Sequence, residues 1–310
     1  MATQITYLIL PHVHLLDLAG ADQVFFEAND YGANLSLQYC SLARGLHTSA
    51  SLPIGRLQHF QKVKLQPGDF LFIPGSSVEY LMSPEFAAEH ELFLWLRERH
   101  ASGVRICSVC TGAFVLGKAG LLNGRKCTTH WKRTDELKRA FPQIRLEEDI
   151  LFAEDGGIFT SAGVTAGIDM ALHILEMIVN EQMAFKVARE LVVYMRRDGA
   201  NSQHSVFLKY RNHIHSGIHK AQDYLQDNLS KKVSLEELAD TACMSSRSLT
   251  RTFRRETGIS VNEYTTLLRQ ERLKEFMKNP RMSRKQMAHE CGLQSERQVL
   301  RLLKAEPPRI

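Results

Sequence analysis

The sequence predicts two folded domains, an α/β domain built on a parallel sheet and, after it, an all-helical domain. Short apolar runs alternate with amphipathic stretches up to about residue 180, and no strand pattern follows residue 215. Residues 216–310 contain 18 Lys and Arg against 12 Asp and Glu, whereas residues 1–215 contain 21 against 22. A basic segment attached to a neutral domain is typical of a nucleic-acid-binding module, although a solvated basic helical face gives the same count.

The first domain alternates between strand and helix patterns. Strands that alternate with helices form a parallel sheet covered on both faces, and ligands of such sheets bind at the carboxyl ends of the strands. The expected strands are 5–10, 35–40, 69–75, 104–109 and 158–161. The expected helices include 18–29, 85–99 and 165–179.

A shift in composition predicts the domain boundary. Residues 196–205, RRDGANSQHS, are polar and contain Gly, Asn and Ser, as linkers do. We expect an α/β ligand-sensing domain over 1–195, a linker over 196–214 and a helical domain over 215–310.

The helical domain contains the same arrangement twice, at 233–258 and 282–306. In the first copy Ser234 and Glu237 form a capping-box signature at the start of one helix. A short turn leads to a second helix, in which Leu249 and Phe253 lie on one face. Helix, turn and basic second helix are the layout of a helix-turn-helix motif. The second copy repeats this pattern with Val299 and Leu303 facing inward and with Arg297 and Arg301 in the places of Arg247 and Arg251.

The run ELAD–ACMSSRSLTRTFRRETGISVNEYTTLLRQERLKE closely resembles the AraC/XylS family of bacterial transcription regulators. The resemblance implies two recognition helices that enter successive major grooves of promoter DNA. It also implies RNA polymerase as a partner and a homodimer. By position, the base-contacting candidates are Arg247, Thr250 and Arg251 in the first copy and Glu296, Arg297 and Arg301 in the second.

The sharpest feature of the α/β domain is VRICSVCTGAFVLGKAGLL at 104–122. A strand runs into Cys110, and Thr111 then opens a helix. A residue on such an elbow is lifted above the sheet edge, where amides and a helix N-terminus favour a thiolate or a bound anion. A buried, inert cysteine is the commoner meaning of this local pattern. A redox pair with Cys107 is disfavoured, because Cys107 falls within the strand.

Five motifs, LLDLAGADQVF, FIPGSS, SVCTGA, CTTHW and FTSAG, together resemble the ThiJ/PfpI superfamily, and more narrowly the branch fused to an AraC-type module. The resemblance implies a flavodoxin-like fold related to class I glutamine amidotransferases. It makes Cys110 the elbow cysteine, with Asp17 and His130 beside it and Gly75 with Ser76 as an anion-binding turn. No His-x-Glu pair follows the elbow, which disfavours amidotransferase chemistry.

Composition argues against a disulfide-stabilised protein, a membrane protein and a metal-binding protein. The six cysteines show no disulfide framework, and no run approaches the length of about 18 apolar residues that a membrane span needs. We expect a cytoplasmic protein with no membrane association. The 13 histidines suggest no metal-ligand cluster, and neither a metal nor another cofactor is expected.

Two functional hypotheses remain. The preferred one is a transcription regulator, an activator, in which the elbow binds a small effector and no catalytic residue is expected. The resemblance implies amino-acid-like or quaternary amine effectors. The alternative is a Cys-dependent hydrolase or glyoxalase-like enzyme that carries an accessory DNA-binding module.

Overall fold

The computed structural model describes residues 2–193, 197, 199, 203, 205–211, 213–277 and 282–304. The chain divides into two compact units, Met1–Gln203 and His204–Ile310, called here the N-terminal unit and the helical unit. The expected linker 196–214 lies partly outside the described residues. Of its described residues, Val206–Lys209 form a short helix, α9, and Tyr210 is buried in the helical unit.

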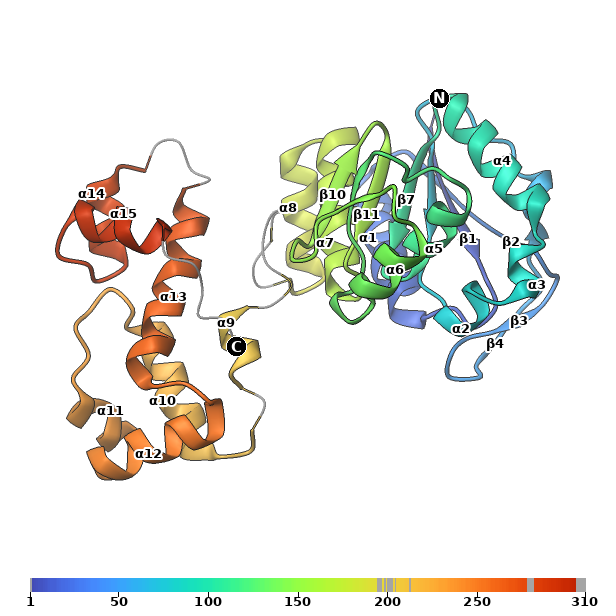
Figure 1. Cartoon of the computed structure of the whole chain (residues 1–310). Coiled ribbons are helices and arrows are strands. Elements are labelled where there is room, and N and C mark those ends of the chain that lie inside the picture. The colour runs from blue at the N-terminus through green and yellow to red at the C-terminus, as the bar shows by residue number, and fades with distance from the viewer. Residues whose placement is uncertain are drawn as a thin grey trace. The chain divides into compact units, whose positions relative to one another are not determined.

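The N-terminal unit contains a seven-stranded sheet in the order β10-β11-β7-β6-β1-β2-β5 (Figure 1). Its main parallel strands follow the flavodoxin-like order 2-1-3-4-5 when counted along the chain, which confirms the expected fold class. The strands are β1 (Thr3–Ile9), β2 (Leu35–Ser41), β5 (Gln58–His59), β6 (Phe70–Ile73), β7 (Arg105–Val109), β10 (Phe152–Asp155) and β11 (Ile158–Ser161).

Strand β10 is absent from the sequence expectation, and it pairs antiparallel with β11. Only one of its four residues is fully buried, so it lacks the apolar run that marks the central strands. Two small sheets were also not expected. They are formed by β3 (Leu46–His47) with β4 (Pro53–Ile54) and by β8 (Lys126–Cys127) with β9 (Arg145–Leu146).

Helices cover both faces of the large sheet, and each face has its own apolar core. Alternate residues of β1 separate the two, since Leu8 joins one core and Tyr7 the other. One face carries α1 (Leu15–Asp30), α7 (Thr165–Ile178) and α8 (Glu181–Glu190). The other carries α2 (Val78–Leu81), α3 (Pro84–Ala87), α4 (His90–Ala101), α5 (Gly112–Lys118) and α6 (Thr134–Ala140), so the single helix expected over 85–99 is two helices.

In the helical unit every element among the described residues is a helix, as expected (Figure 1). The helices after α9 are α10 (Ser216–Asp227), α11 (Leu235–Thr241), α12 (Ser246–Thr257), α13 (Val261–Phe276), α14 (Arg284–Glu290) and α15 (Glu296–Lys304). Among the described residues, no helix is both long enough and apolar enough to cross a membrane.

Candidate functional site

Cys110 lies on a sharp turn between β7 and α5. Its backbone has φ +55°, in the left-handed region that is strained for a residue with a side chain. The Cys110 amide donates to the carbonyl of Ser161, at the end of the neighbouring strand β11. Gly112 allows α5 to start so close to the sheet, because a Cβ at Gly112 would lie 2.2 Å from the carbonyl oxygen of Ile73. The strand-to-helix elbow expected from the sequence is therefore present.

Two glycines bring the ends of neighbouring strands close to this elbow. A Cβ at Gly163, after β11, would lie 2.3 Å from the Cβ of Cys110. A Cβ at Gly75, after β6, would lie 2.4 Å from Oδ2 of Asp17, which lies on α1 just after β1. We call the group of Cys110, Asp17, Gly75, Gly163 and His14 the elbow site. They gather at the carboxyl ends of the parallel strands, where ligands of such sheets bind.

The carboxylate of Asp17 is almost fully buried, with 2 % of the residue exposed. Its Oδ1 accepts a hydrogen bond of 2.7 Å from the amide of Val164. Its Oδ2 lies 3.3 Å from Nδ1 of His14, an ion-pair distance, but accepts no hydrogen bond from the described residues. A buried acceptor without a hydrogen bond is costly, and it is the kind of group that a ligand satisfies.

The charge state of Cys110 depends on its burial and on the charges around it. Burial, and next to it the negative charge of Asp17, raise the pKa of the Cys110 thiol well above its usual range. The Thr111 amide acts in the opposite direction but is outweighed. Desolvation thus outweighs the amides and favours the thiol form over the thiolate that the elbow pattern alone would favour, in line with the buried cysteine that such a pattern more often means.

A histidine that the sequence did not single out, His14, lies beside the acid and the cysteine. Donor atoms of His14, Asp17 and Cys110 lie within 4.8 Å of one another, a grouping that the sequence did not suggest. His130 is outside this grouping: its Nδ1 accepts from the Lys132 amide, and its ring stacks on Trp131. Burial lowers the pKa of His130. His130 still interacts electrostatically with Asp17 and His14, so its expected place at the site stays a prediction, and His14 is added to the candidates.

At the turn formed by Gly75 and Ser76, both donors of Ser76 are engaged within the protein. The Ser76 amide donates to Oγ1 of Thr111 at 2.9 Å, and the Thr111 hydroxyl donates back to the Ser76 carbonyl at 2.7 Å. The Ser76 hydroxyl donates to the carbonyl of Pro11. Thr111 and Ser76 therefore fix the turn to the elbow, and the expected anion-binding role of Gly75 and Ser76 stays a prediction.

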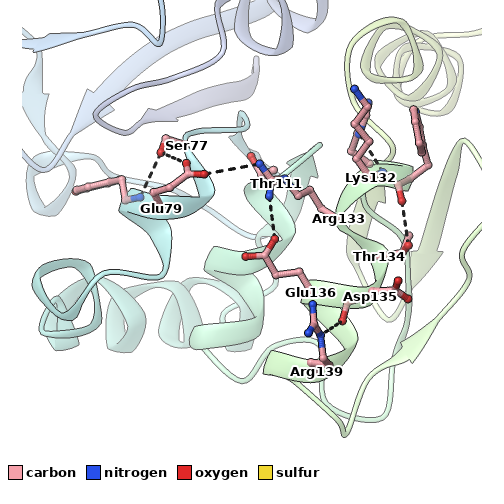
Figure 2. A network of polar contacts seen from close by, with 12 residues as sticks. Ser77, Glu79, Thr111, Lys132, Arg133, Thr134, Asp135, Glu136 and Arg139 are labelled. Carbon is pink, nitrogen blue, oxygen red and sulfur yellow. Dashed lines mark hydrogen bonds and ion pairs between the residues drawn. The ribbon is translucent and has the colours of Figure 1, made fainter.

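A chain of exposed polar contacts joins the loop after β6 to the loop before α6 (Figure 2). The Ser77 hydroxyl donates to Glu79, Glu79 lies 3.8 Å from Arg133, and Arg133 pairs with Glu136 at 3.0 Å. Hydrogen bonds from the Ser77 hydroxyl and from the backbone amide of Glu79 lower the pKa of the Glu79 carboxyl group, so this exposed carboxylate stays charged. The two loops that flank the elbow site are thus held together at the surface by charge.

The second functional region comprises the two helix-turn-helix pairs, α11–α12 and α14–α15. The helix starts of α11, α12 and α14 all carry side-chain caps, from Ser234, Ser245 and Ser283. Leu249 and Phe253 are fully buried in the core of the first pair. The second pair has its own smaller core around Val299, and α13 contributes to both cores. One helix therefore supports two separate helix-turn-helix cores.

The outer faces of α12 and α15 present the expected arginines to solvent. Arg247 and Arg251 are exposed on α12, where they line a shallow hollow with Thr250, and Arg297 and Arg301 are exposed on α15. Within the described residues, none of these four arginines forms an ion pair. Four unneutralised guanidinium groups on two second helices are suited to contacts with base edges and phosphates.

The structure corrects one correspondence between the two copies. Four residues separate α11 from α12, but five separate α14 from α15. Leu249 on α12 and Val299 on α15 are both fully buried and occupy equivalent positions. Aligning these two residues sets the correspondence between all other residues of the two helices. In this alignment Thr250 corresponds to Leu300, which is 38 % exposed, and Glu296 corresponds to Ser246. The expectation that Glu296 takes the place of a base-contacting residue of the first copy is therefore wrong in register.

Comparison with known proteins agrees with these two regions. The chain matches the family model "DJ-1/PfpI family" over residues 30–177 and the model "Bacterial regulatory helix-turn-helix proteins, AraC family" over residues 225–266. The HTH-type transcriptional regulator CdhR of Pseudomonas aeruginosa is 26 % identical over 295 residues, 95 % of this chain and 86 % of CdhR.

Two further similarities cover about two thirds of the chain or slightly less. Isonitrile hydratase of Pseudomonas putida is 33 % identical over 192 residues, 62 % of this chain and 78 % of that protein. The crystal structure of a ThiJ/PfpI family protein from Pseudomonas syringae has a TM-score of 0.54 at 27 % identity, and the match covers 66 % of this chain and 80 % of that one. The two matches over nearly the whole chain, CdhR and GlxA, carry the names of transcription regulators, whereas the match to the enzyme covers 62 % of the chain.

Proposed function

This chain is an AraC-family transcription regulator with an N-terminal domain of the DJ-1/PfpI family, and we propose that its elbow site is the receptor for the effector. The observation that carries the proposal is the buried Oδ2 of Asp17, which accepts no hydrogen bond from the described residues although Nδ1 of His14 lies 3.3 Å away. A ligand with an N–H group satisfies this acceptor, and His14 lies beside it at the half-exposed edge of the site. Such a site holds its ligand by hydrogen bonds and charge, without breaking a bond.

A thermal-shift screen tests this assignment directly. The full chain is screened against small amines, amino acids and their N-methylated forms, because each round of N-methylation removes an N–H donor that could bind Asp17. A compound at one hundred times its Kd stabilises the protein that binds it by about 2.7 kcal/mol, which is a readily measured shift. Compounds that also stabilise the Asp17→Leu variant would show that the effector binds outside the elbow site.

The alternative, a cysteine-dependent enzyme, is favoured by the grouping of His14, Asp17 and Cys110 and by the similarity to isonitrile hydratase. Against it, burial and the charge of Asp17 raise the pKa of the Cys110 thiol, which disfavours a thiolate nucleophile. We propose that the chain is not an enzyme. We also propose, from the family, that it acts as a cytoplasmic homodimer that activates promoters with RNA polymerase.

Cys110→Ser separates the two hypotheses. Serine keeps the size and a hydrogen-bonding group but removes the sulfur, so the receptor hypothesis predicts that the variant keeps most of its effector-dependent thermal shift and reporter response. An enzyme that needs a nucleophilic sulfur would lose turnover entirely. The measurement is a reporter titration of both proteins. A variant that folds normally but no longer responds to any effector concentration contradicts the receptor hypothesis.

Leu300 gives a prediction about base recognition in the second half-site. An exposed leucine between Arg297 and Arg301 on a recognition helix suits the methyl group of thymine. Replacing the contacted thymine by uracil removes only that methyl group, and we expect about a threefold to tenfold loss of affinity for the wild type. Leu300→Ala should bind both operators equally. If the wild type also binds the thymine and uracil operators equally, whichever thymine of the half-site is replaced, Leu300 takes no part in recognition.

A further inference from the structure

Three different kinds of donor atom meet in the elbow site. Nδ1 of His14 lies 3.3 Å from Oδ2 of Asp17, and with Sγ of Cys110 these atoms all lie within 4.8 Å of one another. Asp17 is 2 % exposed and Cys110 is 5 % exposed. Oδ2 accepts no hydrogen bond from the described residues. A nitrogen, an oxygen and a sulfur atom around a buried carboxylate are the donor set that zinc and similar ions prefer.

The first turn of α1 holds two of these donors on one side. His14 is the residue before the helix, and Asp17 lies three positions later, so their side chains share a face. The His14 amide donates to the Gly75 carbonyl at 2.8 Å, which joins this turn to the end of β6. Oδ1 of Asp17 accepts from the Val164 amide at 2.7 Å. That bond orients the carboxylate and leaves Oδ2 for another partner, as outer-shell hydrogen bonds do for metal ligands.

Cys110 supplies the third donor from a distant part of the chain. Its elbow follows β7, whereas α1 follows β1, and both strands end at the same edge of the sheet. The sequence predicts no metal site, because neither segment carries a metal-binding motif of its own. The three donors come together only when the sheet has formed.

We propose that the elbow site binds a divalent transition-metal ion of the zinc type through Nδ1 of His14, Oδ2 of Asp17 and Sγ of Cys110. The 3.3 Å between Nδ1 and Oδ2 matches two ligands that each lie about 2.0–2.1 Å from a tetrahedral ion. A Zn–S bond of about 2.3 Å places the sulfur about 3.6 Å from the other two ligands. Since the donors now lie within 4.8 Å, Sγ has to approach by about 1 Å at most, which a rotation about the Cα–Cβ bond of Cys110 supplies.

The charges of the three side chains suit such an ion. Asp17 contributes one negative charge and the thiolate of Cys110 contributes another, so a divalent ion makes the group neutral and lowers the cost of burying it. When the ion binds, the proton of the thiol passes to solvent, because a thiol that coordinates a metal is deprotonated. Magnesium and calcium prefer oxygen ligands, so the sulfur and the nitrogen disfavour them.

Three protein ligands leave a fourth position of the ion for water or a small molecule, whereas structural zinc sites use four protein ligands. The His14 side chain is 37 % exposed, so an ion can enter the site from this side. Oδ2 of Asp17 is also the atom that binds the proposed effector. The ion and the effector should therefore compete, and this consequence, unlike the binding of the ion itself, rests on the proposed receptor role of the elbow site.

The test uses the full chain with Cys243→Ser as the background, since Cys243 is exposed in the helical unit and its thiol could bind an ion there. Metal-free protein is titrated with Co²⁺, which replaces Zn²⁺ in most sites and reports its ligands by its absorption spectrum. We expect one ion per chain, a thiolate-to-cobalt charge-transfer band and the intense visible bands of a four-coordinate ion. Excess Zn²⁺ should abolish all of these bands.

Variants of the three ligands identify the site. Cys110→Ser should lose the charge-transfer band. Asp17→Asn and His14→Gln should bind Zn²⁺ about a hundredfold more weakly or worse, since loss of an outer-shell partner alone costs about tenfold to a hundredfold. His90→Gln removes an exposed histidine at the start of α4 and is the matched control, which should bind both ions as the background protein does.

X-ray absorption of the zinc-loaded background protein needs no ligand variant, so it decides the proposal even if a variant fails to fold. It should show one sulfur at about 2.3 Å and nitrogen or oxygen ligands at about 2.0–2.2 Å. A zinc spectrum without sulfur, or a cobalt charge-transfer band that persists in Cys110→Ser, overturns the proposal. Equal weakening by His14→Gln and His90→Gln also overturns it, because the ion would then lie elsewhere.

The proposed function is judged by a separate measurement. Compounds that stabilise the wild type but not Asp17→Leu in the thermal-shift screen should stabilise the wild type less when Zn²⁺ is bound. A zinc site without any such compound removes the receptor role and leaves the metal site. Such compounds without zinc binding remove only the metal site.

Discussion

Replacing Arg251 and Arg301 together with alanine is expected to weaken operator binding by about a hundredfold or more. Each guanidinium is exposed on a second helix without an ion-pair partner among the described residues, where it can contact O6 and N7 of a guanine. Loss of one such contact costs about 1–3 kcal/mol. The two arginines lie in separate helix-turn-helix pairs, so their losses should add.

The measurement is a gel-shift titration of the wild type, both single variants and the double variant. Lys209→Ala, which removes an exposed cation of the same unit, is the control and should leave affinity unchanged. Two recognition helices in successive grooves also predict protected segments centred roughly 34 Å, or about 10 base pairs, apart. If Arg301→Ala alone has no effect and the double variant equals Arg251→Ala, then α15 does not contact bases.

Phe253→Ala is expected to lower the free energy of unfolding of the helical unit by about 3–5 kcal/mol, the usual cost of removing a fully buried phenyl ring. Phe253 is fully buried on the inner face of α12. The centroid of its ring lies 5.5 Å from the ring centroid of Tyr264 on α13. Its loss leaves a cavity between the recognition helix and the helix that supports it. Operator binding should fall with stability, while the elbow site is unaffected.

Urea unfolding followed by fluorescence and by amide exchange measures this effect for each unit separately. Phe185→Ala is the matched control, because that ring is 63 % exposed on α8 and its removal should cost little. A variant whose N-terminal unit loses stability in parallel would show that the two units unfold as one, contrary to the separate cores. A loss below about 1 kcal/mol would contradict the close packing of α12.

Much of the fold follows from local chemistry. The central strands are apolar runs, and the capping boxes at Ser234 and Ser283 mark helix starts by side chains that bond their own first turn. The elbow at Cys110 is equally local, since the sequence shows a strand, a small-residue turn and a helix in immediate succession. Such features are encoded within a few residues and can be predicted from them.

Features that depend on distant contacts could not be predicted in this way. His14 joins Asp17 and Cys110 only because β1 and β7 end at the same edge of the sheet. The protonated state of Cys110 depends on burial, which a strand-to-helix pattern does not reveal. Gln203 binds residues more than fifty positions earlier, and its polar surroundings in the sequence indicate only a linker. The correspondence of Leu300 to Thr250 was missed because the turn between α14 and α15 is one residue longer than the turn between α11 and α12.

As a receptor, the elbow site should hold a ligand that controls DNA binding and is released chemically unchanged. An operator titration of the wild type with and without the effector found by thermal shift tests this, with the ligand recovered and quantified by mass spectrometry afterwards. We expect a shifted operator affinity or footprint and full recovery of intact ligand. Ligand consumed in proportion to active Cys110, with the operator titration unchanged, would contradict it and establish an enzyme instead.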